Sequence, residues 1–293
     1  MFHFTYLQAI VVGLLQGVTE LFPVSSLGHA VLLPAWLGGS WKSFAQDPQY
    51  LLIAVAFHFA SAIALFLVFG RRWLHILTSA WSGLRKRSTA GSGLPLLIRL
   101  IVGTIPVAIL GISLNKLFER NFGKPILAAI FLSINGLILF GVEHLTDRRH
   151  AHARAKDSDG AIVERISIGQ AFAVGLGQST ALFAGISRFG VSMSFGMLRG
   201  LSRSVAADFA FLLAFPAILG ASIVKLPKLL VTGAIADGST GPLIAGTITA
   251  FIATFISVTF LVKYFKHNTL RPFALYCLAV GSLSIVRFGI FGS

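Results

Sequence analysis

Six apolar segments in this chain are each long enough, or nearly so, to cross a lipid bilayer. A membrane-spanning helix needs roughly 20 apolar residues, because each residue rises about 1.5 Å through a hydrocarbon core of about 30 Å. The segments near that length are Leu51–Phe69, Leu96–Leu114, Pro125–Val142, Phe209–Leu226, Leu243–Val262 and Phe273–Ile290. Only 12% of the residues are charged, about half the share in a typical soluble domain. The sequence therefore predicts an all-α polytopic membrane protein.

Two further apolar regions are too short to span and are interrupted by polar residues. In the first, Tyr6–Leu15 is followed by polar and turn-forming residues up to Ser26, and then by the short apolar stretch Ala30–Leu37. The second region, Ile168–Leu198, has the same build and is broken from Gln178 onward. Irregular backbone at membrane depth is tolerated only where protein or a wet cavity surrounds it. Both regions are predicted to be re-entrant helical hairpins with polar tips; a kinked span is the alternative.

These two interrupted regions align without a gap when the sequence is shifted by 162 residues. Eight of the 21 positions in 8–28 are then identical, including the pairs Gln16 with Gln178 and Ser25 with Ser187. Apolar sequences resemble one another by chance, so the identical polar and glycine positions carry the comparison. The chain is therefore predicted to contain an internal repeat.

Each half then consists of one hairpin followed by three spans, and a weaker similarity pairs 103–105 with 246–248, both Gly-Thr-Ile. Because three is an odd number, the second hairpin must enter from the opposite face. We expect one membrane domain of two inverted repeats, 1–143 and 167–293, joined by a cytoplasmic linker, 144–166. Such folds place their site where the broken segments meet.

Basic residues are distributed unevenly and indicate the orientation. If loop 71–95 is placed inside, linker 144–166 falls on the same side two spans later. The outside then carries only Lys42, Lys116, Arg120, Lys124, Lys225 and Lys228. Cytoplasmic loops are enriched in Lys and Arg, so both basic loops are predicted to be cytoplasmic. This bias accounts for most of the net charge of +14, and no nucleic-acid partner is needed.

Ionisable residues at membrane depth are costly and by default mark function. Glu20 is the one acidic residue well inside a membrane segment, and Gln16 shares its helix face four residues earlier. Ser25 or Ser26 can cap the returning half-helix. His29 follows within one turn, so this face presents hydroxyls and an imidazole together.

In the second region, 185–188 (Gly-Ile-Ser-Arg) opens the returning half-helix and brings the Arg188 guanidinium to the same central region. Two half-helix N-termini would present N–H groups to an anion, and arginine can bind phosphate oxygens through two hydrogen bonds. The set suits phosphoryl transfer. Ser26 or His29 can attack phosphorus, or His29 can activate water, with Glu20 orienting the group or accepting a proton. The sequence does not choose among these routes.

Other interpretations of these residues stay open. Glu20 and Arg188 can form a purely structural ion pair, and His58, deep in its span, can line the pocket or simply pack. The single cysteine, Cys277, lies in an apolar run and is expected to be a packing residue. A transporter or flippase for a polyprenyl phosphate lipid can use the same anion site. It has little use for a serine and a histidine one turn apart, which favours an enzyme.

Two runs carry a resemblance to a known family. Residues 16–29, Gln-Gly-Val-Thr-Glu-Leu-Phe-Pro-Val-Ser-Ser-Leu-Gly-His, resemble the first signature of the bacterial undecaprenyl-diphosphate phosphatases, the bacitracin-resistance family. Residues 184–192, Ala-Gly-Ile-Ser-Arg-Phe-Gly-Val-Ser, are similar to the second, Pro-Gly-x-Ser-Arg-Ser-Gly-x-Thr, with departures at Ala184, Phe189 and Ser192. Length, hairpins and spans also match. The departures bear on substrate preference and turnover more than on the reaction class.

The resemblance implies hydrolysis of undecaprenyl diphosphate to undecaprenyl phosphate in the bacterial plasma membrane, from a pocket open to the outer face. This reaction recycles the lipid carrier of peptidoglycan synthesis and confers bacitracin resistance. The family motif makes Glu20, Ser26, His29 and Arg188 catalytic, and we expect Gln16, Ser25, Gly185 and Ser187 to bind substrate. Because Gln16 supplies no second carboxylate, a Mg²⁺ ion held by paired carboxylates is disfavoured and no metal ligand is predicted, although a need for Mg²⁺ stays open. A homodimer is compatible with the sequence, which does not determine the oligomeric state.

Overall fold

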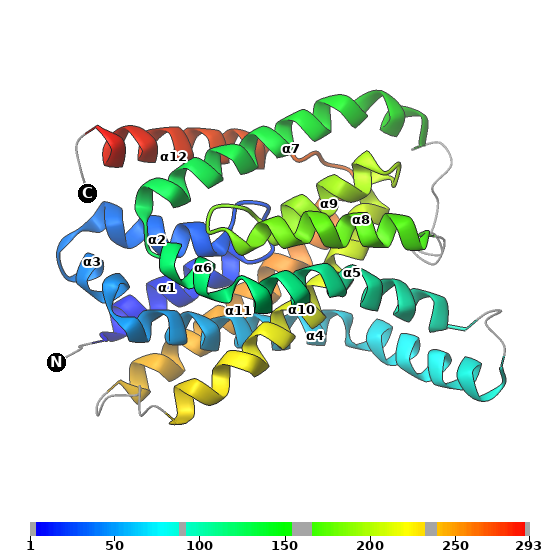
Figure 1. Cartoon of the computed structure of the whole chain (residues 1–293), viewed down its shortest axis with the longest axis horizontal. Helices are drawn as coiled ribbons and strands as arrows, with labels where there is room; N and C mark the ends of the chain where they lie inside the picture. The colour runs from blue at the N-terminus through cyan, green and yellow to red at the C-terminus, as the bar shows by residue number, and fades with distance from the viewer. Residues whose placement is uncertain (1–3, 88–91, 154–165, 232–238, 291–293) are drawn as a thin grey trace.

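The computed structural model describes residues 4–87, 92–153, 166–231 and 239–290, and all regular secondary structure in these residues is helical (Figure 1). The helices are α1 (Tyr6–Thr19), α2 (Ser26–Leu37), α3 (Gly39–Gln46), α4 (Pro48–Arg85), α5 (Leu94–Ser113), α6 (Asn115–Asn121), α7 (Pro125–Ala153), α8 (Ile168–Ser179), α9 (Arg188–Leu198), α10 (Arg203–Val231), α11 (Thr240–Tyr264) and α12 (Arg271–Gly289). A 3₁₀ turn, Thr180–Leu182, follows α8. The predicted all-α class is confirmed.

Six helices among the described residues are long and apolar enough to cross a membrane. These segments are Ile53–Arg85, Leu94–Ser113, Pro125–Thr146, Arg203–Lys225, Thr240–Tyr264 and Arg271–Gly289. Each contains most or all of one predicted span. The chain is therefore a multi-pass membrane protein.

The described parts of two basic regions predicted as loops are largely helical, and the prediction was wrong in this respect. α4 continues to Arg85 and α7 to Ala153, because arginine and lysine are good helix formers and the end of an apolar run marks only the end of its hydrophobic part. Along the extension of α4, Trp73 and Ile76 stay buried, and the Ser79 hydroxyl accepts the Gly93 N–H at 3.0 Å. Residues 154–165 of the predicted linker lie outside the described residues.

The two interrupted regions form two pairs of short helices, α1–α2 and α8–α9. The longest of the four, α1, has 14 residues, or about 21 Å at 1.5 Å per residue, too short for a core of about 30 Å. The first helix of each pair begins with a capping box, formed by Thr5 and Gln8 at α1 and by Ser167 and Gln170 at α8. In Figure 1, α1 and α2 lie mostly in the left half and α8 and α9 mostly in the right half, with their turns near the middle.

Close glycine contacts pack α1 and α8 against long helices of the other half of the chain. A β-carbon added to Gly13 of α1 would lie 2.3 Å from the carbonyl oxygen of Gly246 in α11. One added to Gly175 of α8 would lie 2.3 Å from the carbonyl oxygen of Gly103 in α5. Only glycine permits such an approach of two helix backbones. The internal sequence similarities align Gly13 with Gly175 and Gly103 with Gly246, so the two contacts join equivalent positions.

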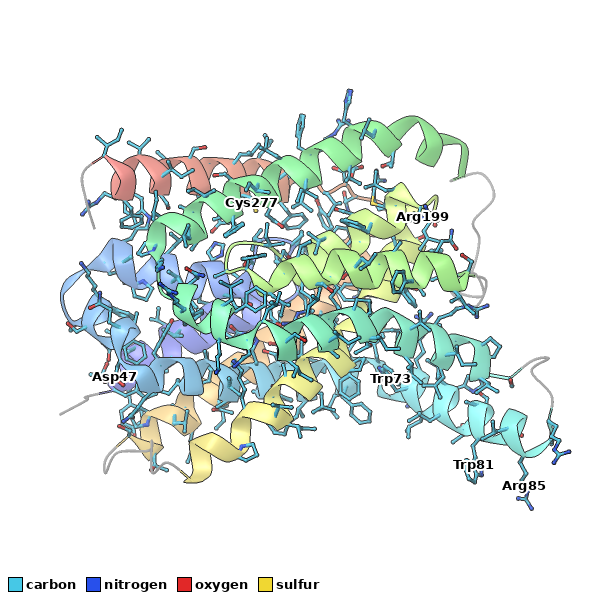
Figure 2. All side chains as sticks on the ribbon, viewed as in Figure 1. Asp47, Trp73, Trp81, Arg85, Arg199 and Cys277 are labelled. Carbon is cyan, nitrogen blue, oxygen red and sulfur yellow. The ribbon has the colours of Figure 1, made fainter. Side chains whose placement is uncertain are left out.

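Charged residues mark the ends of the molecule. Arg85, at the end of α4, and Arg199, after α9, lie toward the same end, whereas Asp47 lies at the opposite end (Figure 2).

Arg203, at the start of α10, forms a buried ion pair with Glu143 of α7. The second carboxylate oxygen of Glu143 accepts the N–H of Leu270 at 3.0 Å, so one carboxylate joins α7, α10 and the start of α12.

Candidate active site

The segments that connect the two helices of each pair, residues 20–25 and 180–187, are the tips of the pairs, and the two tips are in direct contact. The Ser25 hydroxyl caps α2 by accepting the Gly28 N–H at 3.2 Å, and it also accepts the Gly185 N–H from the other tip at 3.1 Å. Gly185 has a φ of 113°, and a β-carbon there would lie 2.5 Å from the Ala128 carbonyl oxygen. Glycine is therefore required at this crossing. Ser25 itself has a φ of 68°, a strained conformation that its hydrogen bonds must hold.

A buried asparagine on α7 joins the same two tips. The Asn135 amide nitrogen donates to the Pro23 carbonyl at 2.9 Å, and its amide oxygen accepts the Ser187 N–H at 3.0 Å. The Ser187 hydroxyl accepts the Gly190 N–H at 3.1 Å and donates to the Phe22 carbonyl at 3.2 Å. The predicted substrate-binding residues Ser187 and Gly185 thus hold the junction itself. Asn135 was not predicted, because its neighbours in sequence carry no signal of this contact.

Glu20 is the centre of the polar cluster beside this junction. Its oxygen Oε2 accepts the Ser26 hydroxyl at 2.6 Å and the Gln16 amide at 2.6 Å. Only 4% of Glu20 is exposed, so the carboxylate depends on these donors. The structure therefore brings together the predicted residues Gln16, Glu20 and Ser26. A serine whose proton points at a buried carboxylate is placed for activation as a nucleophile.

His58 of α4 completes the surroundings of Glu20. Its Nδ1 lies 3.0 Å from Glu20 Oε2 and 2.8 Å from the Gln16 amide nitrogen. His58 is not among the residues that line the cavity described below, but it does more than pack, because it contacts the polar cluster directly. The His58 ring thus lies against the side chains of both Gln16 and Glu20.

His29, on the first turn of α2, shares no hydrogen-bond partner with this cluster among the described residues. Its Nδ1 is 2.8 Å from the Ser25 carbonyl and its Nε2 is 2.8 Å from the Tyr276 hydroxyl of α12. The imidazole and phenol rings stack at 5.6 Å. The expected grouping of the imidazole with the serine hydroxyls is thus not seen in the hydrogen bonds of His29, which involve a backbone carbonyl and a tyrosine. Tyr276 was not predicted to belong to the site.

A cavity lies between the tips and the cluster. It is lined by Glu20, Ser25, Ser26, Leu27, Ala181, Ile186 and Arg188. α2 begins at Ser26 and α9 at Arg188, so two helix N-termini border one cavity and favour an anion there. Arg188 forms no ion pair within the part of the chain that the structure describes. A guanidinium, a serine and a carboxylate therefore line one cavity, and these groups are suited to binding and attacking a phosphate group.

The donors around Glu20 do not make a resident magnesium site. Magnesium prefers oxygen ligands in octahedral geometry, whereas Glu20 Oε2 faces the nitrogens of Gln16 and His58 and the Ser26 hydroxyl. Among the described residues, no group of three or more His, Cys, Asp or Glu side chains could hold a metal ion.

Comparison with known proteins gives full-length matches. The family model described as "Bacitracin resistance protein BacA" matches residues 9–283. The chain is 42% identical to the undecaprenyl-diphosphatase of Mycolicibacterium paratuberculosis, with 97% of each chain covered. It is 39% identical to the undecaprenyl-diphosphatase 2 of Frankia alni, covering 99% of this chain and 100% of that protein. On this similarity, which includes both tips and the cavity, the chain belongs to the bacitracin resistance protein BacA family.

Proposed function

We propose that this membrane protein hydrolyses undecaprenyl diphosphate to undecaprenyl phosphate and inorganic phosphate. The reaction regenerates the lipid carrier of bacterial cell-wall synthesis. The relatives named undecaprenyl-diphosphatase support the substrate. The observation that carries the chemistry is the 2.6 Å hydrogen bond from the Ser26 hydroxyl to buried Glu20, in a cavity that Arg188 also lines.

In the proposed mechanism Ser26 is the nucleophile. Its oxygen attacks the terminal phosphorus while its proton passes to Glu20, and the bond from that phosphorus to the bridging oxygen breaks. Undecaprenyl phosphate leaves, and water then hydrolyses the phosphoserine to release inorganic phosphate. Arg188 and the N-termini of α2 and α9 stabilise the charge that develops on the transferred group. Gln16 and His58 keep Glu20 aimed at Ser26.

The serine–carboxylate pair also favours a hydrolase over a lipid transporter. A transporter needs an anion site, which Arg188 and two helix N-termini supply, but it does not need an activated hydroxyl. Holding Ser26 against a buried carboxylate is useful when a bond to the serine oxygen forms. The flippase therefore stays the alternative to be tested if hydrolysis is absent.

Purified wild-type protein in detergent is expected to release inorganic phosphate from undecaprenyl diphosphate. Ser26→Ala should lower the rate at least about a thousandfold, because no covalent intermediate can form. Ser43→Ala, the same substitution on exposed α3, is the control and should stay within about twofold. A Ser26→Ala rate above about a tenth of wild type would exclude Ser26 as the nucleophile. No release by folded wild type, with or without Mg²⁺, would overturn the hydrolase and direct the work to transport of a polyprenyl phosphate in vesicles.

We also infer that the two halves are inverted repeats and that the ends of α4 and α7 lie in the cytoplasm. The reciprocal contacts of Gly13 with Gly246 and of Gly175 with Gly103 support the repeat, because an internal two-fold relation pairs equivalent positions in this way. Positive-inside bias supports the orientation. The pocket between the tips would then open to the outer face.

Labelling of single cysteines by a membrane-impermeant maleimide in intact cells tests this topology. Ser82→Cys and His144→Cys should be protected, and Ser40→Cys and Lys116→Cys should be labelled, since all four positions are exposed. The wild type is the blank, because its single cysteine is buried. Labelling of only one of positions 82 and 144 would contradict the inverted arrangement.

A further inference from the structure

Tyr276 contacts the site residue His29 from a distant part of the chain. It lies on α12, 247 positions from His29 in the sequence, and its hydroxyl is 2.8 Å from His29 Nε2. The residue is 44% exposed, on a helix apolar enough to span the membrane. A phenol hydroxyl left unpaired in hydrocarbon is costly, and the bond to His29 removes that cost.

The hydrogen bonds of His29 define its tautomer. A backbone carbonyl can only accept, so the Nδ1 atom that lies 2.8 Å from the Ser25 carbonyl must carry a proton. In the neutral imidazole, Nε2 is then the acceptor, and the Tyr276 hydroxyl donates to it. Both ring nitrogens are thereby engaged. The lone pair of His29 faces α12, and the ring is not among the side chains that line the cavity.

This chain of hydrogen bonds ends at the residue next to the nucleophile. His29 Nδ1 donates to the carbonyl of Ser25, whose φ of 68° is maintained by contacts on both its hydroxyl and its carbonyl. The peptide bond that follows leads directly to Ser26, whose hydroxyl must stay 2.6 Å from Glu20. A shift of the Ser25 carbonyl would therefore move the nucleophile.

We propose that Tyr276 is a positioning residue, which through His29 holds the strained Ser25–Ser26 tip in its reactive geometry. It touches neither the cavity nor the Ser26 hydroxyl. This inference rests on the proposed function, because it assigns Ser26 as the group being positioned. It also gives α12, from the second half of the chain, a direct part in the site formed by the first.

The expected result for Tyr276→Phe, which removes only the hydroxyl, is a loss of kcat of roughly tenfold, the size of one hydrogen bond to a neutral acceptor. KM should change less than about twofold. His29→Ala should lower kcat further, and adding Tyr276→Phe to His29→Ala should cost nothing more, since the tyrosine acts only through the imidazole. Tyr264→Phe is the matched control, because that hydroxyl donates to the Thr269 carbonyl away from the cavity. Its kcat should stay within about twofold of wild type.

Three outcomes would overturn the proposal: a Tyr276→Phe kcat equal to wild type, an effect confined to KM, or a further loss of kcat in the double variant. A readout without turnover separates this inference from the proposed function. In ¹⁵N-histidine-labelled protein, Tyr276→Phe should move the Nε2 signal of His29, which His29→Ala assigns by its disappearance. An unmoved signal would reject the hydrogen bond. A moved signal in a protein without phosphatase activity would reject the proposed function alone.

Discussion

Replacing Glu20 with Gln is expected to lower kcat for phosphate release about a thousandfold, equivalent to about 4 kcal/mol of transition-state stabilisation. Gln keeps the size of the side chain and can still accept the Ser26 hydroxyl at its amide oxygen, but it cannot take the proton. The carboxylate is buried and accepts hydrogen bonds from Ser26 and Gln16. The loss should therefore fall on kcat, with KM changed by only a few-fold.

The measurement compares kcat and thermal stability in the same detergent. Asp208→Asn is the matched control, because it also turns a carboxylate into an amide. Its partner is Arg72, at 3.4 Å, and neither residue lines the cavity. The control should keep its kcat within about twofold. If Glu20→Gln folds normally and retains more than a tenth of the wild-type kcat, Glu20 is not the base for Ser26, and another acceptor for its proton must be sought.

The polar pair at the centre of the site could be predicted because its geometry is local. Glu20 is the C-cap of α1, with helical backbone angles, and follows Gln16 by four residues, so helical periodicity alone places the two on one face. Ser25 was one of two candidate caps for the returning half-helix, and it caps α2; the cap that Ser187 forms on α9 was not predicted. The six spans and the two pairs of short helices could also be predicted from segment length, because the thickness of the bilayer sets the minimum length of a spanning helix.

The rest of the site depends on contacts between residues distant in sequence. Asn135 of α7 contacts both tips and Tyr276 of α12 contacts His29 on α2, and no local pattern indicates which polar residue of a span will make such a contact. The direction of His29 was missed for a related reason. Helical spacing places its Cα near Ser26, but the rotamer is set by the partners available, here a carbonyl and a phenol.

The internal sequence repeat also pairs the proposed catalytic residues with different residues in the other half. Gln178 aligns with Gln16 and is equally inside the protein, yet both its amide atoms are without a hydrogen-bond partner among the described residues. The position that aligns with Glu20 is Leu182, and the one that aligns with Ser26 is Arg188. In the proposed mechanism the first half thus supplies the nucleophile and the base, and the second supplies the cation. Similar backbones can diverge in this way because helix caps and glycine contacts, rather than the reacting groups, hold the fold.

Among the residues of the second half of the chain, Arg188 is therefore expected to contribute most to stabilising the transition state. Arg188→Ala should lower kcat/KM by about a hundredfold to a thousandfold, the range found when one preorganised donor to developing charge is removed. Arg188→Lys should recover roughly a tenth of the wild-type value or less, because an ammonium keeps the charge but not the two-pronged hydrogen bonding to phosphate oxygens.

Arg199, at the other end of α9, is a close control for this experiment. Arg199 follows the end of α9 and is exposed, whereas Arg188 begins α9 at the cavity. Arg199→Ala removes the same charge and should change kcat/KM less than about twofold, so a general electrostatic effect of net charge is separated from a specific one. Inhibition by inorganic pyrophosphate supplies a second measurement, and it should weaken in Arg188→Ala but not in Arg199→Ala. Equal losses in the two variants would mean that the guanidinium attracts the anionic substrate from a distance, and that the two helix N-termini alone hold the transferred phosphate.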